Sequence, residues 1–357
     1  MTPAVGAAVA AAWRGTRARD RWLRAALVPA SWAYGAAVGV RNRAYDRGWL
    51  STTRVPARVL SVGNLTVGGS GKTPTALWLA EALLARGRRV AIVARGYRKT
   101  RPGVVVVGDG GGRALASPAE GGDEAAMLAR RFAGPVVTGE RRAAAAALAC
   151  ARFGCDTIVL DDGFQHRALA RDADLVCWAA DDAAAARLLP AGTLREPLRG
   201  LARARAVLVV GEGAPPSTPP GLAVFRGRLV PQAVVAPGAG GRWTTAPLGD
   251  LAGRVVVVVC GVARPERVAA ALAAVGARVV RTLAFPDHHA YGPADVAPIA
   301  AAAAEGRLVT TEKDLVKLER LSGLPPLVAL RVGLEVVDGG ALVDRLLAGP
   351  EVALHHE

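Results

Sequence analysis

Aromatic residues, cysteines and long apolar runs are all scarce in this chain. Aromatic side chains make up only 4% of the 357 residues, so the hydrophobic 52% consists mainly of Ala, Val and Leu. A hydrophobic content this high excludes a disordered protein. No apolar run reaches the roughly 18 residues that a spanning helix needs, which excludes a polytopic membrane protein. A chain of this length is expected to form two domains.

The cysteines also limit what the chain can be. Cys150, Cys155, Cys177 and Cys260 form no CxxC pair. Secreted disulfide scaffolds are short and rich in cysteine, and this chain is neither, so the sequence predicts reduced thiols in the cytosol. Only one histidine, His166, lies near any of these cysteines in sequence, and we expect no structural zinc site.

The net charge of +15 is concentrated at the N-terminus. The first 58 residues contain ten arginines and two acidic residues, and four of the seven tryptophans lie there too: Trp13, Trp22, Trp32 and Trp49. Basic side chains with interfacial aromatic rings indicate contact with an anionic membrane surface. Nucleic acid is the competing partner for so basic a segment. No helix-turn-helix, zinc-finger or RNA-recognition motif accompanies it, so we expect no nucleic-acid partner.

A short apolar stretch at 25–40 lies within this basic segment. It is short for a spanning helix, and Pro29 is expected to break or kink it. Arginines flank the stretch on both sides, which favours a segment lying in the membrane interface. An ordinary helix docked on the core stays an alternative. A secretory signal is a weaker one, because no basic residue precedes the apolar residues 4–13.

From residue 58 onward, strand-like runs alternate with helical patterns. Continuous Val, Ile and Leu runs predict strands buried on both faces of a parallel sheet, at 59–62, 90–94, 136–138, 157–160, 174–178 and 206–210. Helical patterns lie between them, for example at 73–86 and 124–132. This alternation predicts a doubly wound α/β domain.

A Pro-rich stretch at 213–221 ends this pattern and is typical of a linker. Further strands are predicted at 255–259, 278–283, 308–310 and 327–332, with helices at 266–275 and 294–304. These elements predict a second, smaller α/β unit.

The segment 61–75, SVGNLTVGGSGKTPT, follows a predicted strand and precedes a predicted helix. Its glycines allow a tight turn that points N–H groups inward, Lys72 would reach the β- and γ-phosphates, and the Thr73 hydroxyl would bind Mg²⁺. Thr66 stands where the strict phosphate-loop pattern has glycine. In this context the run GGSGKT still predicts nucleoside triphosphate binding. The predicted binding residues are Thr66, Val67, Gly68, Gly69, Ser70, Gly71, Lys72 and Thr73.

The predicted strand at 157–160 ends in Asp161 and Asp162. An Asp pair after a strand is by itself more often a turn or a helix cap. With a phosphate loop upstream, the pair suits Mg²⁺ held beside the phosphates. We therefore expect a P-loop NTPase-like core with a doubly wound parallel sheet at 51–222. It is preceded by an amphiphilic, membrane-associating helical segment at 1–50 and followed by a smaller C-terminal α/β domain at 223–357.

Eight sequence blocks follow one another along the chain: SVGNLTVGGSGKTPT at 61–75, ARGY at 94–97, GDE at 122–124, TGERR at 138–142, DDGFQH at 161–166, LLPAGTLREP at 188–197, FPDHHAY at 285–291 and TTEKD at 310–314. Together they resemble the tetraacyldisaccharide 4′-kinase family of lipid A biosynthesis. The resemblance is collinear from about residue 27 to residue 344. A single block such as ARGY would mean little, but eight in one order are specific.

The resemblance implies a kinase that transfers the γ-phosphoryl group of ATP, with Mg²⁺, to the 4′-hydroxyl of an acylated glucosamine disaccharide 1-phosphate. It also implies a peripheral or monotopic position at the cytoplasmic face of a bacterial inner membrane. Two other functions stay open. One is a membrane-associated P-loop ATPase switch or chaperone without a lipid acceptor. The other is a soluble kinase for a small metabolite, against which the Trp- and Arg-rich segment argues.

The resemblance also implies roles for individual residues. It places the proton acceptor on Asp123, with Glu124 beside it near the metal. It implies that His288 pairs with Asp123 across a cleft between the two domains, orienting it and tuning its pKa. From the residues alone, Asp123 would be the N-cap of the helix at 124–132, and a lone histidine is more often structural. The predicted catalytic set is Asp123, His288, Lys72 and Asp162, and the predicted metal set is Thr73, Glu124 and Asp161.

Arg195 and Glu196 lie in a predicted loop, where an exposed pair is usually a solvated salt bridge. The resemblance makes them candidate ligands of the disaccharide or its 1-phosphate, because a guanidinium fork fits phosphate well. It groups Arg142, Gln165 and His166 with them. Lys313 receives no role.

Overall fold

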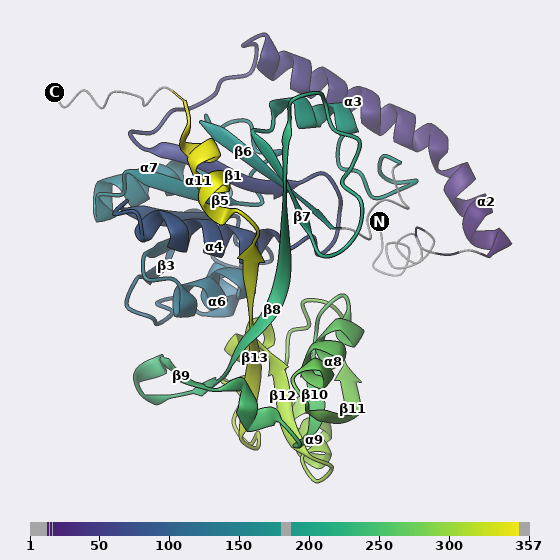
Figure 1. Ribbon diagram of the computed structural model, residues 1–357, viewed down its shortest axis with the longest axis vertical. Coiled ribbons are helices and arrows are strands. Elements are labelled where there is room, and N and C mark those ends of the chain that lie inside the picture. Colours follow the sequence, from purple (N-terminus) through teal and green to yellow (C-terminus); the bar gives the residue numbers. More distant parts are fainter. Residues whose placement is uncertain (1–12, 14, 16, 180–186, 350–357) are drawn as a thin grey trace. The chain divides into compact units, whose positions relative to one another are not determined.

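The computed structural model describes residues 13, 15, 17–179 and 187–349 (Figure 1). Residues 1–12 of the predicted N-terminal segment, and with them most of the stretch considered as a secretory signal, lie outside this range. The chain divides into two compact units whose segments interleave. Unit 1 comprises residues 1–75, 160–228 and 336–357, and unit 2 comprises 76–159 and 229–335. The division at 1–50, 51–222 and 223–357 stays a prediction.

Unit 1 contains a parallel sheet built from the predicted Val- and Leu-rich runs. Its strands are β1 (Arg58–Asn64), β6 (Ala173–Ala179), β7 (Ala206–Val210) and the first residues of β8 (Ala223–Pro237). β1 pairs with β6, β6 with β7, and β7 with β8, all in parallel. All seven residues of β6 are buried, as expected for a strand covered on both faces. The helical elements η2 (Leu198–Arg203) and α11 (Gly339–Leu347) also belong to this unit.

Two helices precede the sheet of unit 1, drawn in purple in Figure 1: α2 (Ala18–Ala26) and α3 (Val28–Asp46). Pro29 lies in the first turn of α3, where a missing backbone N–H costs no intrahelical hydrogen bond. The break in the apolar stretch expected at Pro29 therefore lies at the start of α3, between α2 and α3. No helix in the described ranges is long and apolar enough to span a bilayer.

One side of α3 is fastened to the rest of unit 1. The Tyr34 hydroxyl donates to the Arg195 carbonyl oxygen (2.7 Å), and the Asn42 amide donates to Glu196 Oε2 (3.2 Å). Near the end of the helix, Arg167 forms an ion pair with Asp46 (2.7 Å). Large hydrophobic side chains on α2 and α3 stay exposed nevertheless, among them Trp22 and Trp32. The helix α3 therefore contacts the rest of unit 1 on one side, as in the alternative of a docked helix, and still exposes apolar side chains on another side.

Unit 2 contains the remaining strands of the predicted nucleotide-binding half. β2 (Val90–Ala94) and β4 (Pro135–Thr138) pair in parallel, and β3 (Val105–Asp109), which the sequence does not predict, pairs with β4 in antiparallel orientation. β5 (Thr157–Asp161) has residues in both units. The helices are α4 (Lys72–Leu84), which also has residues in both units, α5 (Pro118–Gly121), α6 (Asp123–Arg131) and α7 (Arg142–Phe153).

A further group of parallel strands in unit 2 corresponds to the strands predicted beyond the Pro-rich stretch. Its strands are β10 (Val255–Cys260), β11 (Arg278–Ala284), β12 (Arg307–Thr311) and β13 (Leu327–Val336), with β9 (Trp243–Ala246) antiparallel to the end of β8. Its helical elements are η3 (Ala239–Gly241), η4 (Leu248–Leu251), α8 (Pro265–Ala274), α9 (Pro293–Ala302) and α10 (Glu312–Leu318).

The run VVVVVC of β10 shows why an unbroken apolar strand fits this position. Val256 and Val258 belong to one core cluster together with Leu272 of α8, whereas Val257 and Val259 belong to another with Ile299 of α9. Alternate side chains of a strand point to opposite faces, so a sheet covered by helices on both faces buries every residue of the run except the half-buried Val255. Figure 1 shows α8 and α9 beside these strands. The predicted α/β fold class is confirmed.

Candidate active site

The loop between β1 and α4 is held in shape by hydrogen bonds. The Asn64 side-chain amide donates to the Thr66 carbonyl oxygen (2.5 Å) and to Ser70 Oγ (2.7 Å). Gly68 and Gly71 have φ values of 126° and 77°, in the region that favours glycine. Thr66 forms an isolated β-bridge with Leu194, an extended conformation open to any residue. The departure from the strict glycine pattern at this position therefore costs the loop nothing.

The two aspartates at the carboxyl end of β5 have different partners. Thr73 Oγ1 donates to Asp161 Oδ2 (2.9 Å). Asp162 instead has Lys72 Nζ at 3.7 Å and accepts two hydrogen bonds from Arg195 Nη1, at 3.0 and 2.9 Å. Asp162 has a φ of 54°, so the chain turns sharply between the two carboxylates. Asp161 therefore binds the Thr73 hydroxyl, and Asp162 contacts the cations Lys72 and Arg195.

The pair Thr73–Asp161 fits the Mg²⁺ ion that ATP chemistry requires. One hydroxyl and one carboxylate, held 2.9 Å apart, are the hard oxygen ligands that Mg²⁺ prefers. No group of three or more His, Cys, Asp and Glu side chains suited to a metal ion occurs in the described part of the chain. A nucleotide-bound Mg²⁺ needs no such group, since it uses one or two carboxylates together with phosphate and water oxygens.

A second site feature begins at α6 in unit 2. The N-cap of this helix is Gly122, so the expectation that Asp123 caps it is wrong. Gly122 has a φ of 97°, and a Cβ there would lie 3.0 Å from the Gly96 Cα; a Cβ on Gly96 would lie 2.9 Å from the Gly121 carbonyl oxygen. The glycines of the ARGY and GDE blocks thus permit two backbone segments to touch. With Gly122 as the N-cap, Asp123 is the first residue of the helix.

Asp123 and His288 form a hydrogen-bonded pair. His288 Nδ1 lies 3.0 Å from Asp123 Oδ2, and the Glu124 backbone N–H donates to Asp123 Oδ1 (2.9 Å). Both partners belong to unit 2, so the pair lies within one compact unit; a cleft between the predicted domains 51–222 and 223–357 stays a prediction. His288 has a φ of 60°, its carbonyl oxygen accepts from Arg98 (3.4 Å), and its ring centroid is 5.3 Å from that of Tyr97.

The surroundings of Asp123 favour its ionised form. Burial raises the pKa of this carboxyl, but the hydrogen bond from His288 and the charges of Lys313, His288 and Lys317 outweigh burial. The pKa of Asp123 therefore lies below its ordinary value of 3.8. At neutral pH the carboxylate carries a full charge.

Two lysines of α10, neither of which has a role predicted from the sequence, lie beside the Asp123–His288 pair. Lys313 Nζ lies 3.1 Å from His288 Nε2, and Lys317 Nζ lies 3.7 Å from Asp123 Oδ2. The two lysines are four residues apart, which puts them on the same face of the helix. In the sequence, the TTEKD block and the four-residue spacing of the lysines are the features that could have pointed to them. Glu124, predicted near the metal, has its carboxylate 3.8 Å from Lys313 Nζ.

Three of the predicted substrate residues lie in one network in unit 1. Glu196 is fully buried, and its carboxylate accepts from Gln165 Nε2 (2.8 Å), Arg203 Nη2 (2.9 Å) and Asn42 Nδ2 (3.2 Å). Gln165 also donates to the Asn64 carbonyl oxygen (2.8 Å), and Arg195 precedes Glu196 and binds Asp162. This network ties the phosphate loop to α3.

The other two predicted substrate residues lie outside this network. The buried Arg142 donates to the carbonyl oxygens of Gly139 (3.3 Å) and Glu140 (3.2 Å) in unit 2. His166 is partly buried in unit 1, and its backbone N–H donates to the Gly163 carbonyl oxygen (2.8 Å). Neither arrangement assigns a ligand.

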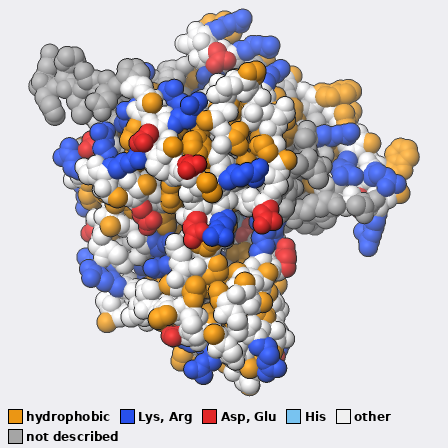
Figure 2. All heavy atoms as spheres, in the orientation of Figure 1, with side chains coloured by type: hydrophobic (Ala, Val, Ile, Leu, Met, Phe, Trp, Pro, Cys, Tyr) orange, Lys and Arg blue, Asp and Glu red, His pale blue; other side chains and the backbone are white. Residues whose placement is uncertain are grey.

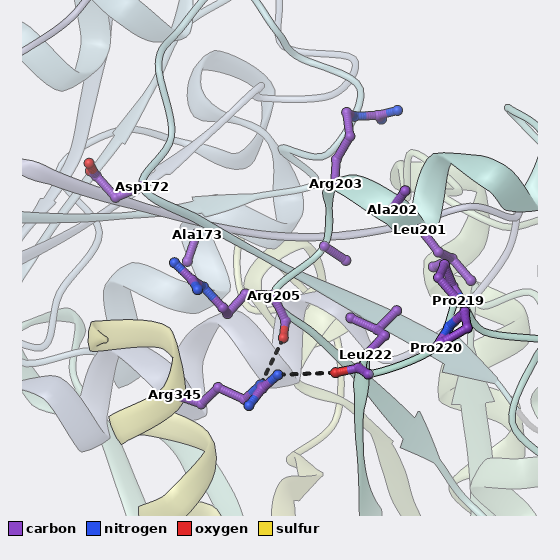
Figure 3. Close-up of a pocket in the computed structure, with 12 residues that line it drawn as sticks. Asp172, Ala173, Leu201, Ala202, Arg203, Arg205, Pro219, Pro220, Leu222 and Arg345 are labelled. Atoms are coloured by element: carbon purple, nitrogen blue, oxygen red, sulfur yellow. Dashed lines mark hydrogen bonds between the residues drawn. The ribbon is translucent and has the colours of Figure 1, made fainter. Parts of the chain in front are cut away.

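A pocket of about 450 Å³ in unit 1 shares Arg203 with the Glu196 network but lies at the other end of the strands from the phosphate loop (Figure 3). Ala173 and Arg205, at the amino ends of β6 and β7, line it, whereas the phosphate loop follows the carboxyl end of β1. Figure 3 shows Arg345 closing one side through hydrogen bonds to the carbonyl oxygens of Arg205 (3.1 Å) and Gly221 (3.3 Å). None of the predicted site residues lines this pocket.

The chain that carries this site is similar to known proteins over most of its length. The model of the LpxK family, tetraacyldisaccharide-1-P 4′-kinase, matches residues 23–349. The chain belongs to this family. The match includes the phosphate loop, Asp123 and His288, and it confirms the resemblance inferred from the eight sequence blocks.

Curated relatives and a solved structure agree with membership of the LpxK family. The chain is 42% identical to the tetraacyldisaccharide 4′-kinase of Anaeromyxobacter dehalogenans strain 2CP-C, over 91% of this chain and 90% of that protein. It is 41% identical to the enzyme of the same name from Halorhodospira halophila, over 87% and 88% of the two chains. The crystal structure of "apo" form LpxK from Aquifex aeolicus in complex with ATP is 32% identical, with a TM-score of 0.77 over 91% of this chain and 98% of that one.

Proposed function

We propose that this chain transfers the γ-phosphoryl group of ATP to the 4′-hydroxyl of tetraacyldisaccharide 1-phosphate, a step in the synthesis of lipid A. The observation that carries the proposal is the hydrogen-bonded Asp123–His288 pair, in a chain that belongs to the LpxK family. A carboxylate oriented by an imidazole suits the acceptance of a proton from an alcohol.

The nucleotide is bound by residues 66–73. The backbone N–H groups of this loop surround the phosphates, and Lys72 stabilises the charge that develops on the γ-phosphoryl group. Thr73 and Asp161 would hold Mg²⁺, and the ion when bound would neutralise phosphate charge; Glu124 is the third residue proposed for the metal. Asp162 holds Lys72 and Arg195 through its two oxygens.

Asp123 orients the 4′-hydroxyl and accepts its proton as the oxygen–phosphorus bond forms. In a loose transition state the attacking hydroxyl loses its proton late, so a carboxylate with a low pKa is a sufficient acceptor. His288 and the Glu124 backbone N–H each bind one oxygen of Asp123, which fixes the plane of the carboxylate. His288 is thus an orienting partner of the base.

Five residues are proposed to act on the disaccharide or its 1-phosphate. Arg195 and Arg142 supply guanidinium groups suited to phosphate. Gln165 and His166 complete the set together with Glu196, whose buried carboxylate acts by holding its neighbours in place.

We place the enzyme at the cytoplasmic face of the bacterial inner membrane, bound peripherally or monotopically to anionic lipid. Trp22, Trp32 and Trp49 are 77%, 72% and 71% exposed, a large solvent exposure for apolar side chains. Figure 2 shows basic and hydrophobic side chains together over α2. Arginine beside tryptophan suits the boundary between lipid headgroups and acyl chains. No nucleic-acid partner is proposed.

Replacing Trp22, Trp32 and Trp49 together by alanine should lower binding to anionic vesicles at least about tenfold, since a tenfold change needs only about 1.4 kcal/mol. Flotation with vesicles containing phosphatidylglycerol measures the bound fraction. Val337→Ala removes another exposed apolar side chain of unit 1, at 63% exposure, and should float like the wild type. Undiminished flotation of the triple variant would exclude these tryptophans as the membrane contact.

The function is tested by transfer of γ-labelled phosphate from ATP to tetraacyldisaccharide 1-phosphate in mixed micelles. We expect labelled lipid that disappears when Mg²⁺ is chelated. Hydrolysis of ATP without labelled lipid would contradict the proposal and would favour the P-loop ATPase switch instead.

A further inference from the structure

The pocket in unit 1 is lined by an arginine whose guanidinium group has no partner among the described residues. Arg205 forms hydrogen bonds there only through its backbone: its N–H donates to the Asp174 carbonyl oxygen (2.8 Å), and its own carbonyl oxygen accepts from Arg345 Nε (3.1 Å). The residue is exposed, so an ion from solvent can reach it. A guanidinium group is always charged and carries five N–H donors, which suits it to bind an anion.

Arg345 supplies a second guanidinium group, whose plane is fixed. Its Nε and Nη2 donate to the carbonyl oxygens of Arg205 (3.1 Å) and Gly221 (3.3 Å), which leaves Nη1 for another acceptor. Figure 3 shows these hydrogen bonds beside the Arg205 side chain, whereas the Arg203 side chain extends away from them. Arg203 is bound by Glu196 (2.9 Å) and is not part of the proposed site. A donor that is already held in place loses little conformational freedom when it binds a ligand.

A third guanidinium group, that of Arg58, lies beside the Arg205 guanidinium. A Cβ on Gly349 would lie 3.4 Å from Arg205 Nη2 and 3.6 Å from Arg58 Nη2. Because glycine has no side chain, an oxygen atom near this position can contact both groups. Arg58 Nε is buried and has no hydrogen-bond partner in the part of the chain that the structure describes. Two cations this close repel each other, and an anion between them turns the repulsion into attraction.

The rest of the lining suits the body of a small molecule. Asp172 Oδ2 accepts from the Val59 backbone N–H (2.7 Å), and no described residue donates to Oδ1, which stays open to a hydroxyl group. Pro219, Pro220 and Leu222 supply apolar surface. The volume of about 450 Å³ lies within the roughly 300–1,000 Å³ of small-molecule sites.

We propose that this pocket binds a phosphate group through Arg205 and Arg345, with Arg58 beside them. The guanidinium fork matches the oxygens of phosphate, and several cations match its double negative charge. Inorganic phosphate and a phosphate ester whose body fills the pocket share this chemistry. The site is separate from the nucleotide site, because Arg58 begins β1 and the phosphate loop follows its end, seven residues or about 20 Å away.

Calorimetric titration of the full chain tests the site, with the nucleotide site saturated by Mg²⁺ and a non-hydrolysable ATP analogue. The probes are inorganic phosphate and glucose 6-phosphate. We expect saturable binding, and Arg205→Met should weaken it at least about tenfold through the loss of charge-assisted hydrogen bonds. The variant should fold normally, because the guanidinium group has no partner within the described residues, and an unchanged melting temperature checks this. Arg54→Met removes an exposed cation elsewhere in unit 1 and should bind like the wild type.

The two probes distinguish the sources of the phosphate group. Equal affinities would identify the bare anion as the ligand, whereas tighter binding of glucose 6-phosphate would identify an ester; either result supports the site. Binding that is lost in Arg195→Met but kept in Arg205→Met would lie at the candidate active site and would overturn the proposal. The absence of saturable binding would overturn it too and would leave the arginines as partners of the carboxyl end of α11. No lipid is phosphorylated in this titration, so its result does not depend on the proposed function.

Discussion

Lys72→Met is expected to lower kcat for phosphoryl transfer roughly 10³-fold, the loss typical of removing a preorganised charge from a transition state. Lys72 directly follows the loop glycines in the sequence, and its ammonium group lies 3.7 Å from Asp162 Oδ1. Methionine keeps the length and apolar stem of the side chain and removes only the charge. Radiolabel transfer to the lipid under single-turnover conditions measures the chemical step directly.

The Lys72 variant should fold normally, which makes the kinetic result interpretable. Asp162 keeps its two hydrogen bonds from Arg195, at 3.0 and 2.9 Å, when Lys72 is lost. We expect a change in the free energy of unfolding within about 1 kcal/mol, as for partly exposed ion pairs. Arg54→Met, which removes an exposed cation of unit 1, is the matched control and should leave kcat unchanged. A Lys72→Met enzyme with more than a tenth of the wild-type kcat would exclude the assigned role.

The parallel strands could be predicted from sequence because burial on both faces leaves unbroken apolar runs. The runs that became β6 and β10 are buried along nearly their whole length. β8 could not be predicted in this way. Its 15 residues mix exposed, half-buried and buried positions in no regular order and include two prolines, so no single face or period describes it. β3, a five-residue edge strand enclosed by glycines, follows β2 with no helix between them, so the alternation of strands and helices does not mark it.

The candidate site shows the same limit. The phosphate loop and the aspartates at the carboxyl end of β5 are local patterns with a known spacing, and sequence alone indicated them. The Asp123–His288 pair joins residues 165 positions apart, and only the family resemblance suggested it. Lys317 was missed because α10 has seven residues, too few to display a helical period, and because its partner Asp123 lies far away in sequence. Long-range pairing of short elements is set by packing, which a sequence pattern does not encode.

Asp123→Asn should abolish most lipid phosphorylation while leaving ATP binding intact. We expect kcat to fall about 10²- to 10⁴-fold, the usual contribution of a positioned base, with the KM for ATP within about twofold. Asparagine keeps the size of the side chain and removes the proton acceptor. Labelled lipid from the wild type and none from Asp123→Asn would establish the substrate class and the acceptor carboxylate together. Near-wild-type phosphoryl transfer by the variant would mean that a group other than Asp123 accepts the proton.

Stability gives an independent check on Asp123. The two carboxylate oxygens accept from the Glu124 N–H and from His288, and an asparagine has only one acceptor oxygen for these two donors. The unmatched donor should cost about 1–3 kcal/mol at neutral pH. Because the pKa of Asp123 is lowered, its stabilising contribution is present above the ordinary value of 3.8 and is lost as the pH falls through the lower folded-state value. The difference in unfolding free energy between wild type and Asp123→Asn should therefore shrink below about pH 4, as measured by denaturant unfolding across pH. A difference that does not change with pH would mean that the carboxylate is not held in its ionised form by His288 and the two lysines.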